Sequence, residues 1–398
     1  MFKNLRIWHK AVLIAVAFSL PIVVLLYLLV NEQNKTIDFA QDERKGLEYL
    51  KPTSKLLTDL LHHRDLAAAA LSGDAASKDQ VTKKQADVDA DFVALEREER
   101  RFGAAFKTSN EYAALRKSWG DLKAGALALK PEQSFEQHNR LIYEALRIIV
   151  RAGNSSNLVL DPDVDSYYAM DALIFKVPDL MEEISQARGF GASAIARGGE
   201  LSATDKTLLA SAKVRILESA QKLKDNIEFG LEANPKMSAT LRPAIEYALT
   251  STNTFLDQLD KRVLAGPTPQ ITTTEYFNEA SKAVDASSKL SDSSANVLDD
   301  LLVARISRSN QSRLISLVAV GVSLLITSLL LVLIVRSITQ PISHLSQVAE
   351  RISLGEMDAK IDIQTREDIG ELAQKFQRLQ VSLKQAMEQL EGREGEKT

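Results

Sequence analysis

Two long uncharged apolar segments constrain the fold of this chain more than any other feature. Residues 11–30 read AVLIAVAFSLPIVVLLYLLV and residues 315–335 read ISLVAVGVSLLITSLLLVLIV, and neither contains a charged side chain. A helix of about 20 residues rises about 30 Å, which matches the hydrocarbon core of a bilayer. We therefore expect two transmembrane helices, with the lipid bilayer as a partner.

A cleaved signal peptide is the alternative explanation for residues 11–30. Its apolar core would be shorter, and no small-residue cleavage site follows at residues 31–34. We expect an uncleaved anchor, so that residues 31–314 lie on the opposite side of the membrane from both termini. The basic residues among the first ten favour an N-terminus on the inner side without deciding it.

The composition of the chain is that of a helical protein. Gly and Pro number only 17 and 10 among 398 residues, which disfavours a turn-rich β-sandwich or barrel. Cysteine is absent, so disulfides, thiolate metal sites and cysteine nucleophiles are excluded. The net charge of −4 argues against a nucleic-acid partner. No phosphate-binding glycine loop or nucleophile elbow occurs, and we expect no catalytic residue, cofactor or metal.

The segment after the second apolar stretch shows two helical patterns joined by a connector. Apolar residues first recur three or four positions apart, at Ile338, Ile342, Leu345, Val348 and Ile352. The second pattern keeps a heptad seam at Ile369, Leu372, Phe376, Leu379 and Leu383. A helix with such a seam is expected to pair with copies of itself.

This segment, about residues 336–388, resembles a HAMP domain, the adaptor that joins transmembrane sensors to cytoplasmic outputs. The matching residues are Pro341 in the first helix, Gly355, Met357 and Ile361 in the connector, and Glu371 at the start of the second helix. The resemblance implies a parallel four-helix bundle in a cytoplasmic homodimer; a generic juxtamembrane coiled coil is the alternative. Residues 31–314 would then face the periplasm of a bacterial inner (plasma) membrane.

The outer region, residues 31–314, carries long helical patterns and an internal repeat. Residues 56–74 align with residues 180–198: each copy has a leucine-rich run, an arginine, a small-residue run and a Gly turn. Two four-helix-bundle-like halves, about 31–155 and 156–314, would explain this similarity. Chance similarity between Ala- and Leu-rich helices is the alternative.

Each copy of the repeat places an arginine in its apolar stripe, Arg64 in the first and Arg188 in the second. A buried guanidinium group must be paired, and its planar fork of donors suits a carboxylate, nitrate or phosphate. One interpretation is an anion pocket with one arginine from each copy. Its other lining residues would come from His63, Tyr167, Tyr168 and Gln186.

The alternative for both arginines is structural. Each could form an internal salt bridge, with Asp59, Glu182 or Glu183 as the candidate partners, or extend its side chain outward to water. The two tyrosines, likewise, could serve only to pack helices.

The stretches around both arginines resemble sensor domains of the nitrate- and nitrite-sensing (NIT) type, or the related helical bimodular type of chemoreceptors. Those families carry a Gln-x-Glu-Arg-Gly-like motif. Here it reads His-His-Arg-Asp at residues 62–65 and Ser-Gln-Ala-Arg-Gly at residues 185–189. The missing glutamate leaves nitrate and a small carboxylate equally open as the ligand that the resemblance implies.

Three acidic residues, Asp161, Asp163 and Asp165, surround a proline before the next helical pattern. Acids at this place suit the N-terminus of a helix. A calcium loop is the alternative, although Ser166 and Ala172 replace the glycine and glutamate that an EF-hand requires.

Together these features predict an all-α sensory transducer that binds a small anion outside and relays a conformational change through HAMP to a cytoplasmic partner or output domain. The alternatives are the input half of a sensor kinase or cyclase, and a regulatory membrane subunit that binds a protein. The expected segments are an inner N-terminus (1–10), spans (11–30 and 315–335), the sensor (31–314), the adaptor (336–388) and a tail (389–398).

Overall fold

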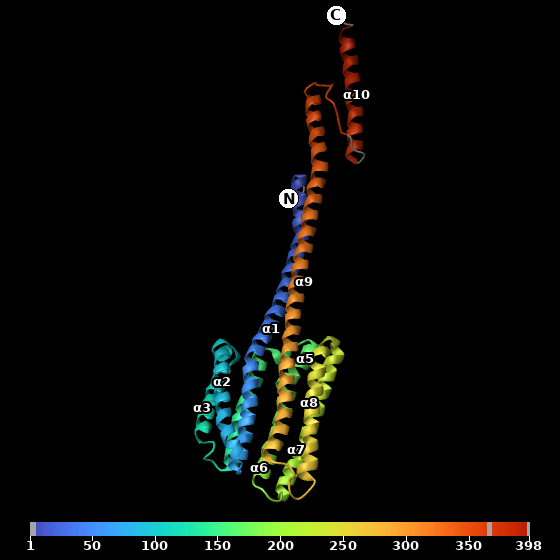
Figure 1. Ribbon diagram of the computed structural model, residues 1–398. Coiled ribbons are helices and arrows are strands. Elements are labelled where there is room, and N and C mark those ends of the chain that lie inside the picture. Colours follow the sequence, from blue (N-terminus) through green and yellow to red (C-terminus); the bar gives the residue numbers. More distant parts are fainter. Residues whose placement is uncertain (1–4, 364–367, 396–398) are drawn as a thin grey trace. The chain divides into compact units, whose positions relative to one another are not determined.

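The computed structural model describes residues 5–363 and 368–395. These residues form helices, and no strand occurs among them, which confirms the predicted all-α class (Figure 1). The α-helices are α1 (Ile7–Leu71), α2 (Ala75–Phe106), α3 (Ser109–Gly125), α4 (Pro131–Ser155), α5 (Val164–Asp171), α6 (Val177–Ala196), α7 (Ala203–Ala233), α8 (Ser238–Gln258), α9 (Thr273–Ser353) and α10 (Asp368–Gly395).

The chain divides into two compact units. The outer unit comprises residues 35–309, and the span unit comprises residues 1–34 and 310–398. Helices α1 and α9 belong to both, because each runs without a break from the outer unit into one of the apolar segments. The first and last helices of the outer region therefore continue into the spans, as the sequence predicts.

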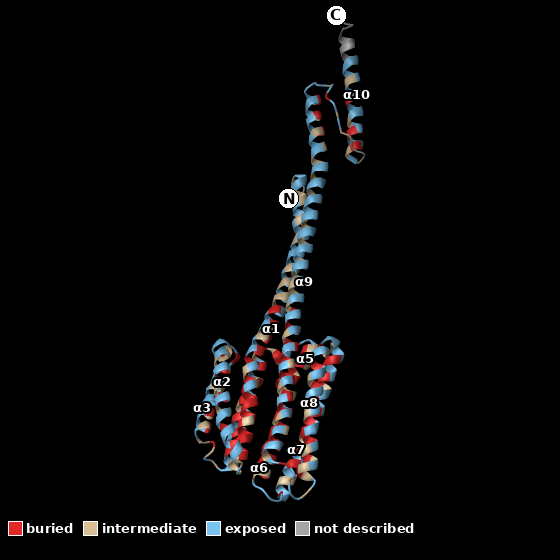
Figure 2. Ribbon diagram, in the orientation of Figure 1, coloured by how far each residue is buried: buried red, intermediate tan, exposed pale blue. Residues whose placement is uncertain are grey.

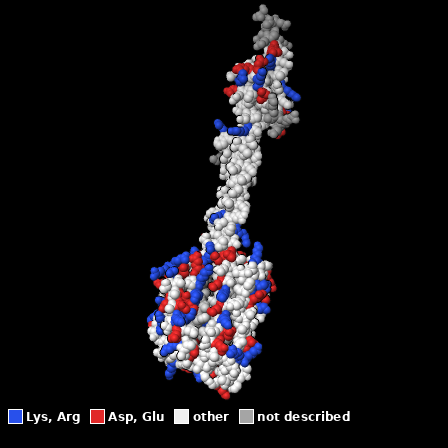
Figure 3. All heavy atoms as spheres, viewed as in Figure 1, with Lys and Arg blue, Asp and Glu red and all other residues white. Residues whose placement is uncertain are grey.

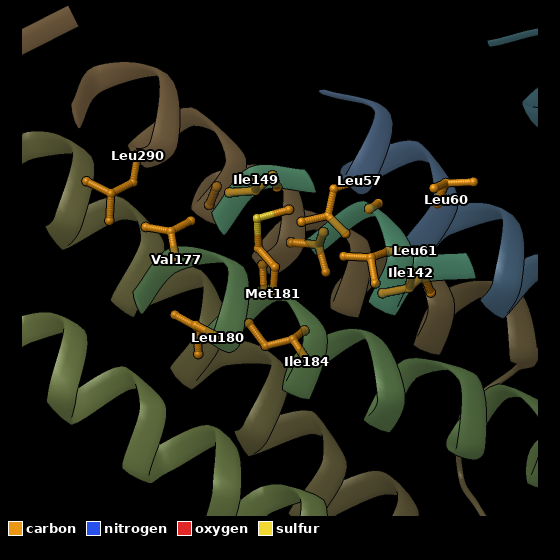
Figure 4. Packing of buried hydrophobic residues seen from close by; sticks show 14 of the residues in the cluster. Leu57, Leu60, Leu61, Ile142, Ile149, Val177, Leu180, Met181, Ile184 and Leu290 are labelled. Atoms are coloured by element: carbon orange, nitrogen blue, oxygen red, sulfur yellow. The ribbon is translucent and has the colours of Figure 1, made fainter. Parts of the chain in front are cut away.

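A hydrophobic core runs through the outer unit and takes buried side chains from all of its α-helices (Figure 2). In its middle, Leu57 and Leu61 of α1 pack with Ile142 of α4 and with Met181 and Ile184 of α6 (Figure 4). Each leucine or isoleucine that is fully buried in this way stabilises the fold by about 1.5–3 kcal/mol. Helix α1 lies at the centre of this packing, since nearly every residue from 56 to 69 is buried.

Local sequence signals set the ends of the helices. The Asp74 side chain accepts a hydrogen bond from the Ser77 amide and so caps α2. Ser202 and Asp205 form a reciprocal capping box at the start of α7. Gly355 follows α9 with a φ of +96°, a left-handed conformation that glycine adopts without strain. That glycine ends the first adaptor helix.

Two segments of the second half are π-helical, Ala172–Lys176 (η3) and Leu259–Leu264 (η5). The first joins α5 to α6, so that residues 164–196 form one continuous rod. A π-helical turn holds one residue more than an α-helical turn and is uncommon away from functional regions.

The span unit holds both apolar segments and the two adaptor helices. The parts of α1 and α9 around residues 11–30 and 315–335 are long and apolar enough to cross a membrane. They show no charged side chain on the face drawn in Figure 3. Next to the outer unit, Arg313 donates a hydrogen bond to Asn34 at 2.7 Å.

Candidate functional site

Arg64 of α1 and Arg188 of α6 meet at one carboxylate in the core of the outer unit. Both arginines and Asp65 are 0% exposed. Arg64 Nε donates to Asp65 Oδ1 at 3.0 Å, and Arg188 Nε donates to Asp65 Oδ2 at 2.8 Å. The two arginines that the internal repeat aligns are thus brought together by a residue that immediately follows the first of them.

The remaining donors of Arg64 are also satisfied, by partners that are buried or partly buried. Its Nη1 donates to Asn139 of α4 at 2.8 Å and to Glu182 of α6 at 2.7 Å, and its Nη2 donates to Ser185 at 3.0 Å. The guanidinium plane lies over the Phe135 ring at 5.0 Å. Four side chains from two other helices therefore hold this one cation.

Arg188 is held in the same manner but reaches a different helix. Its Nη1 donates to Ser281 of α9 at 2.9 Å, and its Nη2 donates to Ser185 at 3.2 Å. The group lies 4.9 Å from the Phe277 ring centroid, also on α9. The second arginine thus connects the site to the helix that continues into the second apolar segment.

Ser185 completes the site between the two cations. Its hydroxyl accepts from both arginines and donates to Asp65 Oδ2 at 2.5 Å. Gly189 leaves room for the Asp65 carboxylate, because a Cβ at this position would stand 2.9 Å from Asp65 Oδ1. Small residues around the second arginine, which the sequence analysis noted, therefore serve to seat the carboxylate.

The charges of the site balance. Two guanidinium groups face two carboxylates, those of Asp65 and Glu182. Burial alone would lower the pKa of Arg64, but the adjacent Glu182 and Asp65 carboxylates raise it above its usual value. A buried cluster of this kind tolerates the loss of either partner badly, because the remaining charge is left uncompensated.

The salt-bridge interpretation of the arginines is correct for one of its three named partners. Glu182 binds Arg64, whereas Asp59 pairs with Lys84 at 2.9 Å and Glu183 pairs with Arg215 at 2.6 Å. Neither arginine extends outward to water.

One of the predicted lining residues contacts the site, and a second lies next to Arg64 in the chain. Gln186 donates to Glu182 Oε1 at 2.7 Å. His63 is buried beside Arg64, and its Nδ1 lies 2.8 Å from Nε2 of His138. His138 Nδ1 lies 2.6 Å from the Ser134 carbonyl oxygen, which must accept a proton from it. His138 Nε2 is therefore the acceptor, and His63 donates to it.

The structure does not bring Tyr167 and Tyr168 to the arginines. Both lie at the start of the continuous rod that contains Arg188, about 30 Å away along the helix axis. Tyr168 packs on Phe229 of α7 at 5.8 Å between ring centroids, and Tyr167 is 42% exposed. These tyrosines pack helices, which was the alternative considered for them.

A second charged cluster joins α1, α9 and the acidic turn. Arg305 of α9 donates to Glu43 of α1 at 2.9 Å, to Asp161 at 2.7 Å and to Asp163 at 2.8 Å. Asp163 occupies the N-cap position of α5, but its side chain binds the arginine instead of the helix amides. The acidic turn is thus tied to α9, and the sequence analysis did not foresee this contact.

Glu43 has an unusually high pKa in this cluster, and burial is the main cause. Burial, followed by the nearby Asp161 carboxylate, raises the pKa of Glu43 to about 9. Glu43 Oε1 and Asp161 Oδ2 are buried and have no hydrogen-bond partner in the described part of the chain. A cavity of about 590 Å³ adjoins Arg305. Among the described residues no group of three or more His, Asp or Glu is placed to hold a metal ion.

Two of the HAMP signature residues lie where the two adaptor helices meet. Met357 and Ile361 of the connector pack on a small cluster formed by Val348, Ile352 and Ala359, together with Phe376 of α10. Pro341 lies inside the continuous helix α9. Glu371 lies in the first turn of α10, where it pairs with Lys375.

Comparison with known proteins matches two family models to the chain. A family model described as "Nitrate and nitrite sensing" matches residues 55–299, which is more than half of the chain. The chain belongs to the nitrate- and nitrite-sensing family. A second model, the HAMP domain, matches residues 333–385. This member of the family is thus a transmembrane sensor with a signal-relaying adaptor, as the sequence resemblances implied.

Two individual proteins are similar to it. The methyl-accepting chemotaxis protein McpA of Bacillus subtilis (strain 168) is 25% identical over 256 residues, which cover 58% of this chain and 38% of McpA. The chain therefore spans well under half of the length of that relative. The structure of the NasR transcription antiterminator aligns with a TM-score of 0.51 and 19% identity, covering 93% of this chain and 99% of NasR. This second likeness concerns the fold.

Proposed function

We propose that the outer unit senses a small oxyanion, such as nitrate, nitrite or a small carboxylate, at Arg64 and Arg188. The observation that carries this proposal is that the two guanidinium groups already bind one carboxylate between them. Nitrate, nitrite and carboxylates present oxygens in a similar planar arrangement, and arginine forks bind such groups strongly. The name of the matched family supports the same ligand class.

The helices that build the site suit it for relaying a signal. Arg64 lies on α1, and Arg188 binds Ser281 of α9, so the two helices that continue into the apolar segments both contribute. A ligand that binds one arrangement of these helices better than another shifts the population toward that arrangement. We propose that the shift passes along α1 and α9 to the HAMP domain, at residues 336–388, and from there to a cytoplasmic partner.

We further propose a homodimer in the bacterial inner membrane, with residues 31–314 in the periplasm and both termini in the cytoplasm. Leu372, Leu379 and Leu383 of α10 occupy predicted seam positions and are 42–55% exposed in the single chain. A second α10 would cover them, because seam residues of a coiled coil pack between helices. The similarity to McpA supports a chemotaxis-type output as the recipient of the signal.

Thermal unfolding of the full chain in lipid nanodiscs tests the ligand assignment. Nitrate, nitrite, formate and acetate should each be compared with chloride at equal ionic strength. We expect at least one oxyanion to raise the melting temperature of the wild type. Arg188→Lys should abolish this rise, because it keeps the charge but loses the planar fork.

Arg215→Ala is the matched control. Arg215 lies on α7 and pairs with Glu183 of α6, the helix that carries Arg188, but the Arg215 side chain is 41% exposed. It should leave the response intact. The assignment is wrong if no oxyanion stabilises the wild type, or if Arg188→Lys responds as the wild type does.

A further inference from the structure

We infer that Asp65 is a tethered occupant of the anion site: its carboxylate fills the place between Arg64 and Arg188 that a free anion would take. Ligand binding at this site is then an exchange of one anion for another. The inference rests on the proposed assignment of the two arginines to anion binding, and it adds how that binding is regulated.

The geometry of Asp65 is that of a bound ligand. Each of its oxygens accepts from the Nε of a different arginine, at 3.0 and 2.8 Å, and Oδ2 also accepts from Ser185 at 2.5 Å. The residue is 0% exposed. Planar oxyanions are bound by arginine forks through contacts of this kind.

The charge balance of the site favours exchange over addition. The two cations are already matched by Asp65 and Glu182. An added anion would leave an uncompensated negative charge away from water, which is strongly unfavourable. If the Asp65 carboxylate leaves as the ligand enters, the number of buried charges stays the same.

The limited space at the site also favours exchange over addition. A Cβ on Gly189 would stand 2.9 Å from Asp65 Oδ1 and 3.3 Å from the Phe135 ring. On the side of Gly189, the carboxylate therefore leaves no room for a second anion. Because Asp65 lies on α1 and Arg188 on α6, the exchange would also break a direct link between these helices.

The sharpest test is chemical rescue. Asp65→Ala removes the atoms of one carboxylate and leaves a seat of the size of formate, nitrite or nitrate. We expect the full-length variant in nanodiscs to melt below the wild type, with unfolding followed by the fluorescence of Trp119, which is buried in the outer unit. Formate should then raise its melting temperature saturably by about 5 °C relative to chloride at equal ionic strength.

Asp59→Ala is the matched control. Asp59 lies on the same helix and is equally buried, but its partners are Lys55 and Lys84, whose ammonium groups reach water. Its melting temperature should also fall, and formate should not restore it. The inference fails if formate acts equally on both variants, or if Asp65→Ala is destabilised and no oxyanion restores it.

Asp65→Asn provides a second measurement if the alanine variant does not fold. The amide keeps the volume of the side chain but carries no charge, so a free anion displaces it more easily. We expect nitrate to bind this variant at least about tenfold more tightly than it binds the wild type, by isothermal titration calorimetry. Unchanged or weaker binding would contradict a tethered competitor.

The two hypotheses fail in different ways. In one outcome, formate rescues Asp65→Ala while no anion binds the wild type. Asp65 then occupies the anion site permanently, so the inference is supported and anion sensing by the wild type is contradicted. If the wild type and Asp65→Asn bind nitrate with equal affinity, anion sensing stands and the exchange is wrong.

Discussion

The hydroxyl of Tyr276 donates a hydrogen bond to the main-chain carbonyl oxygen of Ala187 at 2.7 Å. Burial, and next the proximity of Asp65, raise the pKa of this phenol, so it remains a donor at physiological pH. The bond joins the first turn of α9 to α6 at the residue before Arg188. Helix α9 is thus held to α6 by the Tyr276 side chain as well as by Ser281.

Gly191→Ala should disturb this junction. A Cβ at this position would stand 2.3 Å from the Tyr276 ring, so α9 or the ring must move. We expect a loss of stability of about 1–3 kcal/mol, measured by denaturant unfolding. Gly120→Ala on α3 is the control: nothing lies within 4 Å of its added Cβ, so it should be neutral or stabilising by about 0.5–1 kcal/mol. Equal effects of the two substitutions would contradict the close approach.

Glu43→Gln should change how stability depends on pH. The folded chain keeps the Glu43 proton up to about pH 9, whereas the unfolded chain releases it near pH 4.5. Between these values the folded state binds more protons than the unfolded state. The contribution of Glu43 to the free energy of unfolding therefore falls as pH rises. Glutamine is neutral throughout, and it can still accept from Arg305 while its amide group donates to the neighbouring Asp161 carboxylate.

The melting temperature of Glu43→Gln relative to the wild type should therefore increase from about pH 5 to about pH 8.5. Glu48→Gln, which removes an exposed partner of Arg101, is the control and should show no such trend. Parallel profiles for Glu43→Gln and the wild type would show that Glu43 is already ionised in the folded chain.

The buried imidazole pair predicts sensitivity to acid. Burial lowers the pKa of His138 to about 4, and burial together with the neighbouring His138 lowers the pKa of His63. The unfolded chain then binds more protons below about pH 6.5, so stability falls on acidification.

We expect His138 to account for a loss of about 2 kcal/mol between about pH 7 and about pH 5, and His63 to add a loss in the same direction. The double variant His63→Leu with His138→Leu should lose less over the same range, as followed by thermal unfolding. An unchanged pH profile in the double variant would assign the acid sensitivity to other groups.

The absence of cysteine makes the proposed dimer easy to test. Leu379→Cys introduces a thiol at a seam position that is 55% exposed in the single chain. In a parallel pair of α10 helices the two thiols approach within disulfide range, so mild oxidation of membranes should give a covalent dimer. Gln385→Cys, on the opposite side of α10, should cross-link far less on non-reducing electrophoresis. Equal cross-linking would argue against the seam.

The features that the sequence predicts well depend on local patterns. The spans follow from length and lack of charge, and the end of the first adaptor helix follows from Gly355. Arg64 and Arg188 were found because each interrupts an apolar stripe with a charge, and their meeting follows from the repeat. These patterns can be recognised without knowing which helices pack together.

The features that were missed depend on tertiary packing. Asp65 follows Arg64 directly, and adjacent residues on a helix do not share a face. A single stripe therefore does not indicate Asp65 as a buried partner, whereas nearly every residue of α1 is buried at this level. The contact of Arg305 with Glu43 joins residues 262 positions apart. No local pattern links such a pair, and its signal is only an arginine near the end of an apolar face.

The π-helical turn at Ala172–Lys176 sets the direction in which the second arginine points. It places one extra residue in the rod before α6, whereas α1 is described as α-helical throughout. An added residue turns everything beyond it by about 100°. Deleting one residue from this turn would therefore rotate Arg188 by about 100° relative to α5. The π-turn thus couples the orientation of the buried arginine to that of the helix that begins at the acidic turn.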